Sequence, residues 1–200
     1  RGAASLLDTY QVERRPVAER NVALSWAIWK DVRKAGHTLG AVLGVRYESA
    51  AVIPDDAEPP QVADPVTDFI PSARPGSRAP HHWLVLEGRR LSTIDLFDGR
   101  FVLLTGTSAW STAAEQVASE LRLPLVSRVI EDEEWERLYE VSGGGAVLVR
   151  PDGFVAWRDR GSVEPSVDVL KDVLSRVLGL SRRPKSGTGD GIPDRPPMPL

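Results

Sequence analysis

The chain has 200 residues, no cysteine and a formal net charge of −3 at pH 7. This length suffices for one hydrophobic core with a helical appendage. The absence of cysteine excludes disulfides, thiolate metal sites and thiol redox chemistry, and it is compatible with a cytoplasmic protein. The acidic balance predicts no nucleic-acid partner, and the apolar runs are too short for a membrane span. Because Arg1 is neither a methionine nor the start of a signal peptide, we expect further sequence upstream.

Two helices are predicted before residue 38. The first ends near Glu13 or Arg14, where Pro16 either interrupts it or opens the second helix. The second helix runs to a stop near Gly36. Its apolar face consists of two adjacent stripes: Ala18, Val22, Ser25, Trp29 and Val32, beside Val17, Asn21, Leu24 and Ile28. A face this wide needs a partner surface, and we expect a domain outside this chain to supply it.

Proline and acidic residues dominate residues 48–80, which we interpret as an irregular connector rather than a folded unit, with Tyr47 as a candidate anchor. Residues 181–200 have the composition of a disordered tail. Gly187, Gly189 and Gly191 alternate in that tail. They lack the strand–loop–helix context of a phosphate site, so we expect them to bind no phosphate.

A compact domain is predicted between the connector and the tail. Its elements are strands at 101–105 and 123–130, a hairpin at 145–157, and helices from Ser108 or Ser111 to about 121, at about 131–139, and from Pro165 to 180. The hairpin turn is Pro151-Asp152-Gly153, and Trp110, Trp135 and Trp157 are candidate core residues. The order β-α-β-α-β-β-α is that of the thioredoxin fold. It predicts an α/β domain with a mixed sheet and flanking helices.

The loop after the first strand of this domain is where thioredoxin-fold enzymes carry their active site. Here it contains hydroxyls but no thiol, and no proline precedes the hairpin at residues 142–145. We interpret Ser108, Ser111 and Thr112 as helix-capping residues rather than nucleophiles. Thiol–disulfide and peroxidatic activity are therefore excluded.

Two other groups could carry chemistry. His81 and His82 are adjacent but lack further ligands at a useful spacing, so packing or hydrogen bonding is favoured over a metal role. The acidic cluster comprises Glu131, Asp132, Glu133, Glu134 and Glu136. We interpret it as a solvated helix start, with a general-acid pair as the remote alternative. The sequence thus assigns no catalytic, cofactor-binding or metal-binding residue.

Five blocks of the chain resemble, in order, the C-terminal part of FAD-dependent aromatic-ring hydroxylases. That family comprises the phenol hydroxylase-like and polyketide hydroxylase-like flavoprotein monooxygenases. The blocks are 7–18 (LDTYQVERRPVA), 76–81 (GSRAPH), 91–97 (LSTIDLF), 101–106 (FVLLTG) and 145–158 (GAVLVRPDGFVAWR). Each block alone is modest evidence, but five in family order are specific, and together they span most of residues 5–160.

The resemblance implies a parent enzyme that uses FAD, NAD(P)H and dioxygen to hydroxylate a phenolic or polyketide ring. The nucleotide-binding motifs of that family lie upstream of these blocks. The resemblance therefore implies that this chain binds no cofactor and is inactive alone. It divides the chain into the last helices of the flavin domain (1–37), the connector (38–75), a thioredoxin-like C-terminal domain (76–180) and the tail (181–200).

The implied partners are the N-terminal flavin domain and an aromatic small molecule, and a homo-oligomer is left open. The alternative is a stand-alone, redox-inactive thioredoxin-like module for binding or scaffolding. Such a module has no need of the block at Glu13 to Pro16, which favours the hydroxylase.

Overall fold

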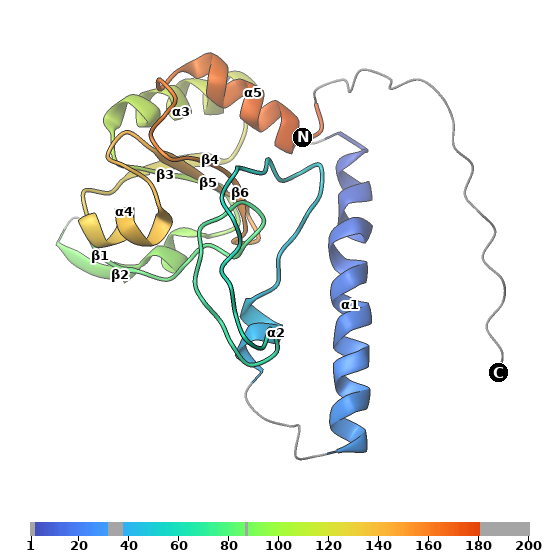
Figure 1. Cartoon of the computed structure of the whole chain (residues 1–200). Helices are drawn as coiled ribbons and strands as arrows, with labels where there is room; N and C mark the ends of the chain where they lie inside the picture. Colours follow the sequence, from blue (N-terminus) through green and yellow to red (C-terminus); the bar gives the residue numbers. More distant parts are fainter. Residues whose placement is uncertain (1–2, 32–37, 87, 181–200) are drawn as a thin grey trace.

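The computed structural model describes residues 3–31, 38–86 and 88–180 (Figure 1). The predicted helix stop near Gly36, the stripe residue Val32 and the predicted tail at 181–200 lie outside these residues.

Four strands form the central mixed sheet, in the spatial order β4-β3-β5-β6. They are β3 (Phe101–Thr105), β4 (Leu125–Val129), β5 (Ala146–Val149) and β6 (Val155–Asp159). Strand β3 runs parallel to β4 and antiparallel to β5, and β5 and β6 form the predicted hairpin. Every residue of β3, β5 and β6 is buried, because helices or loops cover both faces of the sheet. The predicted β-α-β-α-β-β-α order and the mixed α/β fold are confirmed.

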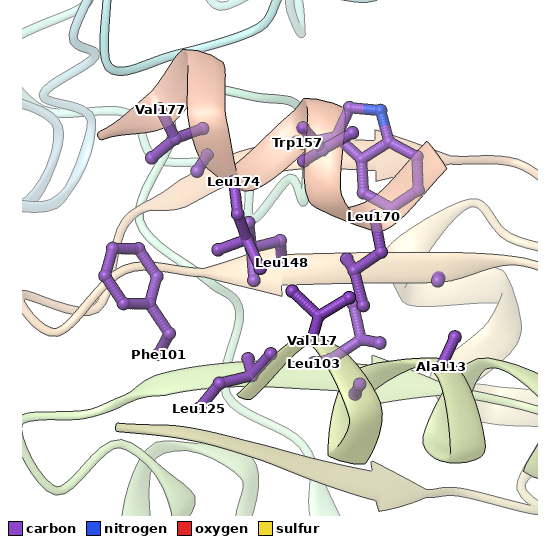
Figure 2. Packing of buried hydrophobic residues seen from close by; sticks show 14 of the residues in the cluster. Phe101, Leu103, Ala113, Val117, Leu125, Leu148, Trp157, Leu170, Leu174 and Val177 are labelled. Carbon is purple, nitrogen blue, oxygen red and sulfur yellow. The ribbon is translucent and has the colours of Figure 1, made fainter. Parts of the chain in front are cut away.

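Three helices pack on this sheet: α3 (Ser108–Leu121), α4 (Glu133–Tyr139) and α5 (Val167–Val177). Helices α3 and α5 cover one face, where Val117 and Leu174 meet Leu103 and Leu148 of the strands (Figure 2). Helix α4 covers the other face. Trp110, Trp135 and Trp157 are all buried, which confirms them as core residues.

A two-stranded hairpin that the sequence pattern did not predict precedes the central sheet. Strands β1 (Trp83–Leu86) and β2 (Arg89–Ser92) pair antiparallel and lead into the 3-10 helix η2 (Thr93–Leu96). Ser92 and Asp95 close this helix start with a reciprocal capping box. Neither strand alternates apolar and polar residues, since one is WLVL and the other RRLS, so the pattern typical of a half-buried strand is absent.

The N-terminal segment forms one continuous helix, α1 (Leu6–Lys30), so the predicted break at Pro16 is wrong. A proline inside a helix removes one backbone hydrogen bond and costs about 3 kcal/mol. Contacts on both sides of Pro16 hold the helix together: Glu13 and Val17 each pack on the rest of the molecule. The short helix α2 (Leu39–Leu43) follows.

The connector is irregular, as predicted, but it is packed against the sheet. The backbone N–H groups of Ile53 and Gly76 donate to the carbonyls of Ala156 and Val155, both at 2.8 Å, and cover the outer edge of β6. Gly76 has a positive φ of 90°, and a side chain there would collide with the backbone of Tyr47. This part of the connector therefore belongs to the folded unit, which corrects the expectation of a separate linker. The domain boundaries at 37, 75 and 180 stay predictions.

A buried ion pair attaches the same segment to β6. The Arg158 side chain is completely buried, and its Nε donates to Oδ2 of Asp55 at 2.8 Å. Its Nη1 donates to the Tyr139 carbonyl at 3.1 Å and to Glu140 at 3.2 Å. The charge of Arg158 is thus compensated by a residue of the proline-rich connector.

Candidate functional site

The hydroxyls after β3 serve local structure. The residue that caps α3 is Thr107, whose Oγ1 accepts a hydrogen bond from the Ala109 N–H at 3.3 Å. The expectation that Ser108 or Ser111 would be the cap is therefore wrong. The Oγ atoms of Ser111 and Ser127 lie 2.5 Å apart, and Thr112 donates to the Ser108 carbonyl at 3.1 Å. Within the described residues, none of the three predicted hydroxyls contacts a histidine or a carboxylate.

Replacing Thr107 by alanine is expected to lower the free energy of unfolding by about 1 kcal/mol, the usual contribution of an N-cap hydroxyl. Ser108→Ala is the matched control, because Ser108 is exposed and its hydroxyl caps nothing. Urea denaturation of both variants measures the difference. Equal midpoints for the two variants would contradict the assignment of Thr107 as the cap.

The two histidines make hydrogen bonds, the role that the sequence favoured. Nδ1 of His81 lies 2.6 Å from the Ser92 hydroxyl, and Nε2 of His82 lies 3.1 Å from Oδ1 of Asp132. The Trp135 N–H and then His82 donate to Asp132 and lower the pKa of its carboxyl. Asp132 is the N-cap of α4, so the acidic cluster forms a helix start as predicted. No cluster of three metal-ligating side chains occurs in the part of the chain that the structure describes.

The best-developed polar site joins α1 to the β5–β6 hairpin. Nη1 and Nη2 of Arg150 donate to Oε1 and Oε2 of Glu13 at 2.6 and 2.9 Å. Nη2 also reaches Oδ2 of Asp152 at 2.7 Å, and the Ser49 hydroxyl donates to Glu13 at 2.6 Å. The side chains of Glu13 and Arg150 are only 4% and 12% exposed. We call these four residues the Glu13–Arg150 clamp.

Burial disfavours the charged guanidinium of the clamp. The hydrogen bonds that Arg150 donates to Glu13 and Asp152 outweigh this effect and raise the pKa of Arg150 above its ordinary value. A two-pronged contact between a guanidinium and a carboxylate also fixes the relative orientation of the two groups. The clamp therefore holds α1 in a defined direction on the hairpin.

An aromatic stack supports the clamp. The rings of Tyr47 and Phe154 are stacked with centroids 4.2 Å apart, which confirms Tyr47 as an anchor of the connector. The guanidinium groups of Arg14 and Arg150 lie 5.4 and 5.7 Å from the centre of the Tyr47 ring. Arg78 lies 4.8 Å from the centre of the Phe154 ring. These contacts join α1, the connector and the hairpin into one cluster.

Beyond the clamp, α1 presents an apolar surface to solvent. Val22, Trp26 and Trp29 are 58%, 57% and 77% exposed, and the two indole rings meet edge to face at 5.4 Å. We call these three residues the tryptophan face. Their spacing of i, i+4 and i+7 could have identified the face, but the predicted stripes omitted Trp26.

Among the helices that the structure describes, none combines the length and the apolar character that a membrane span requires.

Comparison with known proteins identifies the class of this chain. Residues 72–181 match the family model for the C-terminal domain of aromatic-ring hydroxylases, and the chain belongs to that family. The resemblance of the five sequence blocks is thus confirmed.

Individual relatives extend beyond this chain. It is 41% identical over 193 residues to aklavinone 12-hydroxylase of Streptomyces purpurascens, which covers 88% of this chain and 35% of the relative. It is 37% identical over 180 residues to 2,4-dichlorophenol 6-monooxygenase of Delftia acidovorans, with 84% and 31% covered. The structure of aklavinone-11 hydroxylase with FAD and aklavinone superposes with a TM-score of 0.76 and 38% identity, covering 89% of this chain and 36% of that one. The chain therefore spans about a third of the length of these proteins.

Proposed function

We propose that the chain is the C-terminal part of an FAD- and NAD(P)H-dependent monooxygenase that hydroxylates a phenolic or polyketide aromatic ring. The names of its relatives, which include a polyketide hydroxylase and phenol monooxygenases, support this reaction class. The share of their length that the chain matches supports its status as one part of such an enzyme.

The role of this part is structural. A flavin fits poorly in the one strand–loop–helix junction that opens the domain, between β3 and α3. A side chain at Gly106 would collide with the backbone of Gly143, and the buried Trp110 at the start of α3 donates its Nε1–H to the Gly144 carbonyl at 3.0 Å. Because the protein itself closes this junction, no step of the hydroxylation is assigned to residues of this chain. The expected cytoplasmic location and a homo-oligomer both stay predictions.

The tryptophan face is the structural observation that supports this chain being one part of a longer enzyme. An exposed pair of indoles on a helix marks an interaction surface, because burying each one removes a large apolar area from water. The relatives contain about twice as much additional chain as the part matched here. We therefore assign the flavin-binding part of the same polypeptide as the occupant of the tryptophan face.

Expression of the whole reading frame that contains this chain tests the proposal. The longer protein is expected to purify with FAD, to oxidise NAD(P)H faster when a phenolic or polyketide substrate is present, and to add one oxygen atom to that substrate. The 200-residue chain alone is expected to do none of these. A reading frame that encodes only these 200 residues would instead support a stand-alone thioredoxin-like module.

A further inference from the structure

We infer that the Glu13–Arg150 clamp acts at a distance from the flavin: it sets the direction of α1 and so holds the tryptophan face in place for the flavin-binding part. Arg150 is in this view a positioning residue of the enzyme. The link to flavin rests on the proposed function, whereas the mechanical role of the clamp is a property of this chain.

The burial pattern of α1 makes the clamp its main point of attachment. Glu13 is the one buried residue of this helix, every residue of which the structure describes. Weaker contacts flank it: Leu6 and Val17 are partly buried, and the Arg20 guanidinium donates to the Ala41 carbonyl. Beyond Arg20, no residue of α1 is buried.

The geometry of a helix then amplifies any movement at the clamp. Glu13 and Trp29 are 16 positions apart, which corresponds to about 24 Å along the helix axis. A tilt of about 10° at Glu13 would thus move Trp29 by about 4 Å. Apolar side chains are in contact only when their heavy atoms lie within about 4.5 Å, so this movement is enough to separate them. A small loss of order at the clamp is therefore enough to separate the tryptophan face from its partner.

The hydrogen bonds of the clamp are suited to preventing such a tilt. Both prongs of the Arg150 guanidinium are engaged by Glu13, while Asp152 fixes the guanidinium from the hairpin and Ser49 fixes the carboxylate from the connector. A lysine at position 150 would supply the charge but not the fork. Arg150→Lys is therefore expected to hold the direction of α1 less firmly than Arg150 does.

The first experiment measures the direction of α1 in the 200-residue chain. Because the chain has no cysteine, Lys30→Cys and Glu115→Cys introduce two unique, exposed sites for spin labels, on α1 and α3. Electron–electron double resonance on labelled chain diluted into unlabelled chain, which removes distances between associated copies, is expected to give one narrow distance distribution in the parent chain. Arg150→Met and Glu13→Gln are expected to broaden it, and Arg150→Lys to broaden it less.

Two controls separate this effect from unfolding. Arg15→Met removes an exposed ion pair with Glu19 on the same helix and is expected to leave the distribution narrow. The exchanged pair Glu13→Arg with Arg150→Glu restores the opposite charges and is expected to give a narrow distance distribution again. This variant decides the question if the single variants unfold. A distribution that stays narrow in Arg150→Met, with the near-ultraviolet dichroism of the core tryptophans intact, would overturn the inference.

The second experiment uses the longer protein and the dissociation rate of FAD. Arg150→Met is expected to raise this rate by about two- to thirtyfold, the usual range for energetic coupling between distant sites. Arg15→Met is expected to leave the rate unchanged, and Arg150→Lys to raise it by less than Arg150→Met does. An unchanged rate in Arg150→Met, together with a broadened distance distribution, would overturn the link to flavin. A longer parent protein that holds no FAD would contradict the proposed function and leave the first experiment as the decisive test of the clamp.

Discussion

Replacing Asp55 by alanine is expected to lower the free energy of unfolding by about 3 kcal/mol, although Asp55 lies in a proline-rich segment without regular structure. The reason is Arg158, whose side chain is completely buried and whose Nε donates to Asp55 at 2.8 Å. Without Asp55, its nearest remaining carboxylate is Glu140, which is 45% exposed and lies at 3.2 Å. A buried guanidinium that loses its buried partner destabilises a fold strongly, because its desolvation is no longer compensated.

Urea denaturation of Asp55→Ala and Asp56→Ala measures this effect. Asp56 is the matched control, because it is the next residue in the same segment and is exposed. Its replacement is expected to change the stability by less than about 0.5 kcal/mol. If both variants unfolded at the midpoint of the parent chain, the connector would not be part of the folded unit.

We expect the isolated chain to self-associate through its tryptophan face, and the double variant Trp26→Gln, Trp29→Gln to abolish most of that association. The tryptophan face is uncovered in this chain, and large exposed apolar patches promote association. Because truncating a buried interface tryptophan costs about 2 kcal/mol or more, we expect the dissociation constant to rise at least about tenfold. Sedimentation velocity over a range of concentrations measures this change, and thermal unfolding checks that the fold is retained.

Val85→Gln is the control for that experiment. Val85 is 72% exposed on the β1–β2 hairpin, so its replacement removes an exposed apolar side chain from another surface. It is expected to leave the association unchanged. The sequence pattern alone would have directed the substitutions to Leu24 and Ile28, but both are partly buried and their replacement would perturb packing as well. Association that survives in the double variant would contradict the role of the tryptophan face.

The sequence predicted the thioredoxin-like domain well because its signals are local. The apolar runs of β3 and β5, the Pro151-Asp152-Gly153 turn and the acidic start of α4 each determine the structure of their own neighbourhood. Gly153 has the positive φ of 81° that the turn requires. The sequence predicted Ser108 or Ser111 as the cap of α3 and missed Thr107, because several neighbouring hydroxyls can serve as a cap.

The features that the sequence did not reveal depend on partners far along the chain. Arg150 is 137 residues from Glu13, and Arg158 is 103 residues from Asp55. In the sequence Glu13 is followed by Arg14 and Arg15, and such a charged run is typical of the solvent-exposed face of a helix. In the structure Glu13 is buried. Both halves of the clamp do lie in blocks that resemble the hydroxylase family, and that coincidence was the one available signal.

Titration of the isolated chain with FAD tests the central claim most directly. Flavin fluorescence and absorbance are followed as the chain is added, with the protein from the whole reading frame as the positive control. We predict no saturable change with the 200-residue chain and stoichiometric binding by the longer protein. Stoichiometric, tight binding of FAD by the isolated chain would contradict the account, because its residues would then form the flavin site themselves.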